Sequence, residues 1–162
     1  MLLAALILGC VTLERLGELV LANRNTARLL ARGGREAGAG HYPAIVALHA
    51  AWLVGLWLFA LQREIEPLFL AVYAVLQGLR IWVLATLGRR WTTRIIVVAG
   101  ETLVARGPYR FVRHPNYWVV AGEIACLPLV FGMVAYAALF SVLNGLVLAV
   151  RIRAEERALR PA

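Results

Sequence analysis

The sequence predicts an all-α integral membrane protein with about five transmembrane helices. Three observations lead to this fold class: the 162 residues are 62% hydrophobic, the mean hydropathy is +0.75, and arginines gather after alternate apolar runs. A soluble domain is only about half apolar, so the bilayer is the expected solvent for most of this chain. We expect a single membrane domain over 1–162, in which 1–87 supplies the first three helices and 88–162 the rest.

The apolar runs cover 2–22, 43–61, 67–87, 117–131 and 133–150, and each is compatible with a crossing or with half of a tight hairpin. The first run lacks the basic start and small-residue cleavage pattern of a signal peptide, so we expect it to stay in the protein. The run at 117–131 is short for a crossing, and Pro128 and Gly132 mark its far end. The last two runs should therefore form one helical hairpin with a buried or tilted turn.

Two polar segments interrupt the runs. The first, 23–42, is rich in glycine and should be partly flexible, as a lid over a site would be. The second, 88–114, carries β-branched runs at 94–98 and 102–104 on either side of Gly100. This pattern predicts a short β-hairpin within the second segment.

Arginines follow the first, third and last runs, up to Arg160, whereas the loop between the second and third runs holds only Arg63 beside Glu64 and Glu66. The positive-inside rule then places the N-terminus outside and the C-terminus in the cytoplasm. The net charge of +8 is explained by this topology and by anionic lipid, so we expect membrane lipid and no nucleic acid as a partner.

Several ionisable and amide side chains lie inside the runs, in the halves that face the cytoplasm. A charge at that depth costs a few kcal/mol, so these side chains should face one another or a wet cavity. One interpretation is structural pairing of Glu14 or Glu18 with Arg80, and the other is contact with a substrate or a transported solute. The candidates for substrate contact are Glu14, Glu18, Arg80, Glu123 and Asn144.

The polar block 107–117 directly precedes the fourth run. Pro115 fits the first turn of a helix, where a missing amide hydrogen costs nothing, and His114 or a neighbour would cap it. Basic residues beside a helix start suit an anionic group, although a juxtamembrane anchor would look the same. At the end of the last run, Arg151 and Glu155 are four positions apart and lie on one helix face, where they can present opposite charges to one ligand. We expect no metal site.

These motifs together resemble the isoprenylcysteine carboxyl methyltransferase (ICMT) family over roughly 88–160. The resemblance rests on Gly107-Pro108-Tyr109-Arg110, Arg113-His114-Pro115-Asn116-Tyr117, Glu123, and Arg151 with Glu155-Glu156. The stretch Glu14-Arg15-Leu16-Gly17-Glu18-Leu19 and the pair Arg24-Asn25 resemble a short bacterial branch associated with methylation of alkylpyrone-type lipids.

The resemblance implies an enzyme of the bacterial inner membrane that binds S-adenosylmethionine on the cytoplasmic side, without a Rossmann domain, and releases S-adenosylhomocysteine. Its acceptor would be a carboxylate or acidic hydroxyl of a lipophilic or prenylated molecule. Arg151 and Glu155 would be catalytic, with Arg151 near the acceptor. The cofactor would contact Tyr109, Arg113, His114, Pro115, Tyr117 and Glu156.

One departure from the family pattern is Glu101-Thr102, where many relatives have a histidine before Leu103-Val104. This departure leaves the cofactor contact of that segment open. Other interpretations are a membrane reductase or phospholipid N-methyltransferase with a similar helical core, and a small transporter. Nicotinamide dependence would favour the reductase, whereas polar residues spread through the whole membrane depth would favour the transporter. The oligomeric state does not follow from the sequence.

Overall fold

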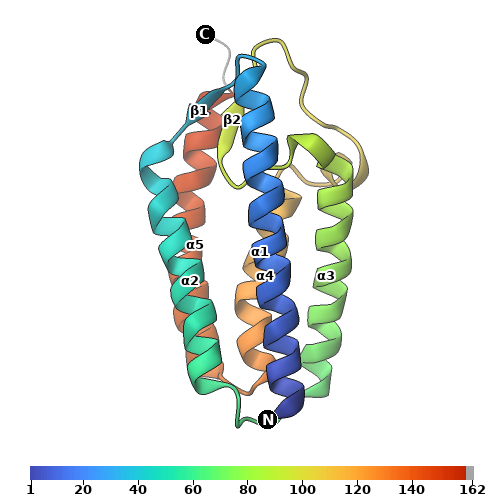
Figure 1. Cartoon of the computed structure of the whole chain (residues 1–162), viewed down its shortest axis with the longest axis vertical. Coiled ribbons are helices and arrows are strands. Elements are labelled where there is room, and N and C mark those ends of the chain that lie inside the picture. The colour runs from blue at the N-terminus through green and yellow to red at the C-terminus, as the bar shows by residue number, and fades with distance from the viewer. Residues whose placement is uncertain (160–162) are drawn as a thin grey trace.

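The computed structural model describes residues 1–159, so Arg160 lies outside the described part. Within it the chain forms five α-helices and one two-stranded sheet, with the helices running along the long axis of the molecule (Figure 1). The N-terminus lies at one end of the bundle, and the two strands lie at the other. The helices are α1 (Leu2–Ala31), α2 (Tyr42–Phe59), α3 (Pro67–Leu87), α4 (Pro115–Val130) and α5 (Val134–Ala158).

Three helical segments in the described residues are long and apolar enough to cross a membrane, namely Ala39–Phe59, Pro67–Arg90 and Val134–Ala158. The other two helices differ from the expected spans in length or charge. Helix α1 is 30 residues long and extends beyond the predicted 2–22 into the segment expected to be flexible, while Glu14, Arg15 and Glu18 interrupt its apolar part. Helix α4 has 16 residues, about 24 Å, which is less than the thickness of the hydrocarbon core.

The predicted hairpin of the last two helices is present, and its turn has a clear cause. Gly132 adopts a φ of 64°, the left-handed conformation that glycine accepts without a Cβ penalty. Its amide donates to the carbonyl of Leu129, and the amide of Met133 donates to the carbonyl of Pro128, both at 3.0 Å. These two bonds form a Schellman motif, which ends α4 and sends the chain back into α5.

The prediction of a β-hairpin within 94–104 is wrong, because its first strand pairs with a different segment. Strand β2 (Ile95–Val97) pairs antiparallel with β1 (Arg35–Ala37), which belongs to the first polar segment. The turn around Gly100 does form, because the amide of Glu101 donates to the carbonyl of Val98 at 3.3 Å, but 102–104 forms no strand. The β-branched run therefore indicated a strand correctly, whereas its partner comes from a distant part of the chain.

The bundle has three successive layers along its axis. Apolar side chains, among them Leu8, Leu56, Leu127 and Phe131, pack at the end that holds the N-terminus. Charged side chains from α1, α3 and α4 meet in the middle. At the opposite end lie the sheet and the short 3₁₀ turns η1 (Ala39–His41), η2 (Gly88–Arg90) and η3 (Gly107–Arg110). This last layer encloses the pocket described next.

Candidate functional site

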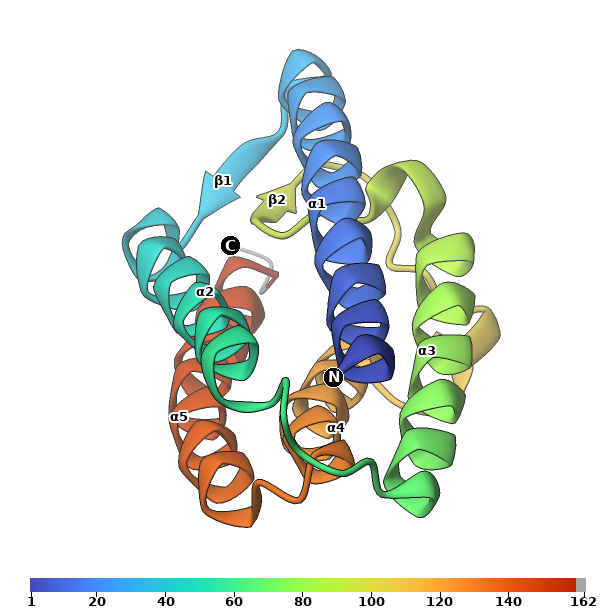
Figure 2. The same ribbon diagram turned by 60° about the horizontal axis from the view of Figure 1, so that its bottom comes forward.

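A pocket of about 610 Å³ lies at the end of the bundle that carries the sheet. Its walls come from segments far apart in sequence: the end of α1, the turn η2, strand β2, the start of α4 and the end of α5. Figure 2 shows β2 beside α1, with the end of α5 nearby. Residues of both polar segments, of the start of α4 and of the end of α5 therefore line one pocket.

A chain of polar contacts crosses the wall of this pocket from α5 to α4. Arg151 Nε donates to the Tyr117 hydroxyl at 2.9 Å, and that hydroxyl donates to Glu155 Oε2 at 2.5 Å. His114 Nδ1 lies 3.7 Å from the same carboxylate oxygen, and its ring stacks on Tyr117 with centroids 5.4 Å apart. Tyr117 thus joins the two residues that the sequence placed on one face of the last helix.

The start of α4 explains why His114 and Tyr117 are held side by side. Pro115 is the first residue of the helix and is buried, and His114 is its N-cap residue. The His114 ring makes no side-chain cap; instead, its backbone carbonyl accepts from the amide of Tyr117 at 3.1 Å. The imidazole is consequently free to face the pocket. Pro115 shapes the helix start but does not line the pocket.

The remaining predicted cofactor residues, Tyr109, Arg113 and Glu156, also line the pocket. Burial, together with the nearby carboxylate of Glu155, raises the pKa of Tyr109. Its phenol therefore stays protonated, and can donate a hydrogen bond, at pH values where an ordinary tyrosine would have lost its proton. Arg113 and Glu156 are exposed and carry opposite charges at the mouth of the same pocket.

Three polar atoms of the pocket lining are buried without a hydrogen-bond partner among residues 1–159: Trp91 Nε1, His114 Nε2 and Asn116 Oδ1. Leaving such an atom unpaired costs about 1–3 kcal/mol. Their gathering in one pocket is what a ligand with several polar groups would satisfy.

Glu101 lines the pocket and is also paired with two arginines. Its two carboxylate oxygens pair with Arg32 at the end of α1, at 2.5 Å, and with Arg90 in η2, at 3.3 Å. These contacts tie the loop after β2 to both neighbouring elements. The departure from the family pattern at this position therefore has a structural partner within the chain.

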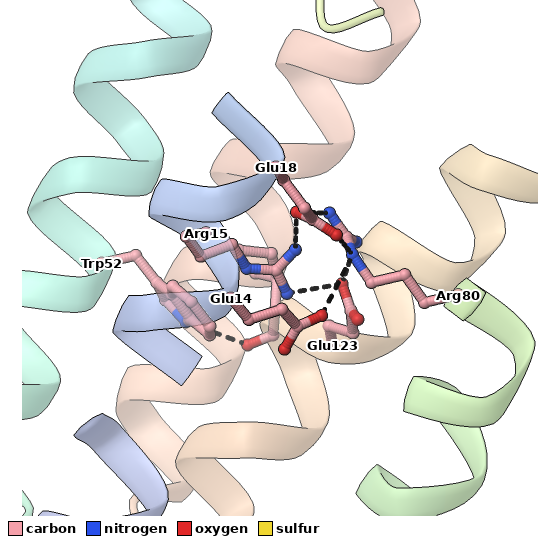
Figure 3. A network of polar contacts seen from close by, with 7 residues as sticks. Glu14, Arg15, Glu18, Trp52, Arg80 and Glu123 are labelled. Atoms are coloured by element: carbon pink, nitrogen blue, oxygen red, sulfur yellow. Dashed lines mark hydrogen bonds and ion pairs between the residues drawn. The ribbon is translucent and has the colours of Figure 1, made fainter. Parts of the chain in front are cut away.

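The predicted substrate residues on α1, α3 and α4 form a buried ion cluster below the pocket (Figure 3). Arg80 bonds to Glu18 through Nε and, at 2.5 Å, through Nη2; it also donates to Glu123 at 2.6 Å and lies 3.4 Å from Glu14. Arg15 donates to Glu123 at 2.9 Å. The structure thus contains the predicted pairing of Glu14 and Glu18 with Arg80, and none of the cluster lines the pocket. Substrate contact stays a prediction for these residues.

A glutamine of α3, one turn before Arg80, also belongs to this cluster. With its amide oriented to satisfy its neighbours, Gln77 donates to Glu14 at 3.0 Å and to Glu123 at 3.1 Å, and it accepts from the Tyr73 hydroxyl at 2.5 Å. Asn144 lies apart, on the buried face of α5 that also carries Arg151. Its side-chain oxygen is buried without a partner in the described chain.

Of the three pocket residues with unpaired polar atoms, the sequence-based site prediction missed two, Trp91 and Asn116. Asn116 lies inside the motif block that was singled out, and its place between Pro115 and Tyr117 was a sufficient signal. Trp91 gave a weaker one: an aromatic residue next to Arg89 and Arg90, just beyond an apolar run, is common at membrane interfaces.

Comparison with known proteins identifies the family of the chain. A model of the isoprenylcysteine carboxyl methyltransferase (ICMT) family matches residues 69–161. The uncharacterized protein YpbQ of Bacillus subtilis is 37% identical over 160 residues, which is 96% of this chain and 95% of that protein. An uncharacterized protein of Haemophilus influenzae is 25% identical over 93% of this chain and 91% of its own length. No solved structure matches the chain significantly. The chain therefore belongs to the isoprenylcysteine carboxyl methyltransferase family of membrane-bound methyltransferases.

Proposed function

We propose that the protein uses S-adenosylmethionine to methylate an oxygen of a lipophilic acceptor, either a carboxylate or an acidic hydroxyl. The observation that carries this proposal is the chain of contacts from Arg151 through Tyr117 to Glu155 and His114 at the wall of one pocket. Family membership supports methyl transfer in general, and the acceptor class rests on the chemistry of this chain of contacts.

The pocket residues fit the cofactor. Methionine, ribose and adenine groups bring donors and acceptors that the unpaired atoms of Trp91, His114 and Asn116 lack. The cofactor supplies a methyl carbon already activated by a sulfonium, so no strong base is needed for an acceptor that arrives as an anion. Glu155 and the ring of Tyr117 suit a cationic group, through charge and through the negative face of the ring.

Arg151 is suited to hold the acceptor. It is 8% exposed and bonds to Tyr117 through Nε, while its two terminal nitrogens have no hydrogen-bond partner among the described residues. A guanidinium with free terminal nitrogens can bind two oxygens of an anionic group. The bond to Tyr117 fixes its orientation, so the acceptor oxygen would be aligned beside the residues that hold the donor.

The layered bundle agrees with a lipophilic acceptor and a cytoplasmic donor. The pocket lies at the end where the arginine-rich segments gather, which the positive-inside rule assigns to the cytoplasm. We propose that the host membrane is the bacterial inner membrane. The water-soluble cofactor would enter from the cytoplasm, and the apolar part of the acceptor would come from the bilayer.

The test is methyl transfer from labelled S-adenosylmethionine to a lipid extract of the host, followed by identification of the labelled product. We expect wild-type protein to label one lipid class, and Arg151→Ala and Glu155→Ala to lose about a hundredfold or more in rate. Arg153→Ala is the matched control, because Arg153 is an exposed arginine of the same helix and lies outside the pocket. Unchanged turnover in both pocket variants would contradict the assignment of the site. Activity that depends on a nicotinamide cofactor would show that the protein is a reductase and not a methyltransferase.

A further inference from the structure

Trp91 lies outside the sequence motifs, and the proposed function names it only as one of three unpaired polar residues of the pocket. It is 3% exposed, it lines the pocket, and its indole nitrogen has no hydrogen-bond partner among residues 1–159. Tryptophan carries one donor and no acceptor on its side chain. A buried indole N–H of this kind requires an acceptor, and the pocket is the place from which one can come.

A side chain of α1 forms hydrogen bonds to the backbone of the turn that carries Trp91. Asn25 of α1 is fully buried, and its Nδ2 donates to the carbonyl of Gly88 at 3.2 Å and to that of Trp91 at 2.8 Å. The amide of Trp91 in turn donates to the carbonyl of Gly88 at 3.1 Å. Asn25 therefore holds the backbone at the start of η2 and directly after its end, so the turn that carries Trp91 is fixed before any ligand binds.

Aliphatic side chains of α1, α3 and β2 line the pocket near η2, together with Arg90, Thr92 and Arg94. Leu29 follows Asn25 by one turn of α1, Leu87 directly precedes η2, and Ile95 begins β2; all three line the pocket. Glu155 and His114 lie on α5 and at the start of α4. A neutral donor among aliphatic side chains suits an aromatic heterocycle with ring nitrogens.

We propose that the Trp91 indole N–H donates a hydrogen bond to a ring nitrogen of the adenine of S-adenosylmethionine, and that Leu29, Leu87 and Ile95 contact the faces of the base. This inference rests on the proposed function, because it assigns one end of the same pocket. It also orients the ligand: the adenine lies toward η2 and β2, and the sulfonium lies toward Tyr117 and Glu155.

Calorimetric titration with S-adenosylhomocysteine tests the hydrogen bond. Trp91→Phe keeps an aromatic ring and removes the N–H, and we expect it to bind about tenfold more weakly than wild type. Trp118→Phe is the matched control, since Trp118 is 72% exposed on the outside of α4 and should bind like wild type. The thermal unfolding of each purified variant shows whether it is folded.

Deaza analogues of the ligand identify the acceptor atom without relying on a variant. The 1-deaza, 3-deaza and 7-deaza forms of S-adenosylhomocysteine each replace one ring nitrogen by C–H. We expect one of them to bind wild type about tenfold more weakly than the parent, and to bind Trp91→Phe as well as the parent does.

Each outcome bears on a different statement. If wild-type protein fails to bind S-adenosylhomocysteine, the proposed function is wrong. If wild type binds it and all three analogues equally well, the ring contact is wrong while the proposed function stands. Equal affinity of wild type and a folded Trp91→Phe for the parent ligand would overturn the inference in the same way.

Discussion

At the scale of single residues, Tyr117 has the central position in the site. Its hydroxyl accepts from Arg151 and donates to Glu155, so one oxygen fixes both a cation and an anion. The order of Arg151 before Glu155 along the helix is the less favourable one for a direct ion pair. The bridge through Tyr117 holds both side chains at the pocket wall without requiring them to neutralise each other.

The raised pKa of Tyr109 gives a prediction about alkaline pH. The folded protein keeps the phenol proton at a pH where the unfolded chain loses it. The contribution of this group to stability is therefore complete below about pH 10, the ordinary tyrosine value, and is lost as the pH rises through the raised value. An ultraviolet titration of wild type and of Tyr109→Phe measures this ionisation. The difference between the two absorbance curves should be centred above about pH 10. A difference centred at or below that value would mean that water reaches the phenol freely.

The motif residues could be predicted from the sequence, but their partners could not. Spacing placed Arg151 and Glu155 on one face, and the block before α4 indicated His114 and Tyr117. The stacking of His114 on Tyr117 and the clamping of Trp91 by Asn25 depend on contacts between helices. A pattern within one helix carries no information on what the neighbouring helix presents.

At the scale of elements, the pairing of β1 with β2 joins the two polar segments that the sequence treated separately. The Tyr42 hydroxyl also lies 3.0 Å from Thr93 Oγ1, and Arg94 pairs with Glu36 at 2.8 Å. The run Ile95–Val97 predicted a strand because its residues are β-branched. Its partner was missed because the pairing spans more than fifty positions of the chain, and local turn signals favour the nearest return segment.

Gly34 provides a test of this pairing. A Cβ at Gly34 would lie 2.7 Å from the Leu29 carbonyl oxygen and 2.9 Å from Ile96 Cγ2, whereas one at Gly40 would meet nothing within 4 Å. Gly34→Ala should therefore push β1 away from β2 at a cost of about 1–3 kcal/mol, and Gly40→Ala should not. Hydrogen exchange at the amides of Ile95–Val97 measures the effect. Equal protection in the two variants would show that the strands yield without cost.

At the scale of the whole molecule, the ion cluster separates the apolar end of the bundle from the pocket. The depth of Glu14, Glu18, Arg80 and Glu123 within their runs predicted that they would meet, because an isolated charge in the membrane is costly. Their exact partners depend on how α1, α3 and α4 pack, which the sequence does not specify. The cluster thus confirms the expected pairing and leaves its role in substrate contact to experiment.

Arg80→Leu distinguishes the two roles of the cluster. Removing this guanidinium leaves Glu18 and Glu123 buried with too little positive charge, so a structural role predicts a loss of about 3–5 kcal/mol in stability. Thermal unfolding of the purified protein in detergent measures it, with the exposed loop residue Arg63→Leu as the control, expected within about 0.5 kcal/mol of wild type. A stable Arg80→Leu protein that has lost only methyl transfer would instead assign the cluster to the acceptor.

The clamp from Asn25 to Gly88 and Trp91 has an evolutionary consequence. The match to the family model begins at residue 69, yet the side chain that holds the backbone of Gly88 and Trp91 comes from the first helix. The two regions therefore cannot diverge independently: a relative that replaces Asn25 must find another donor for these carbonyls or rebuild the turn after its third helix. We expect exchanges at position 25 to be inherited together with exchanges at 88–91.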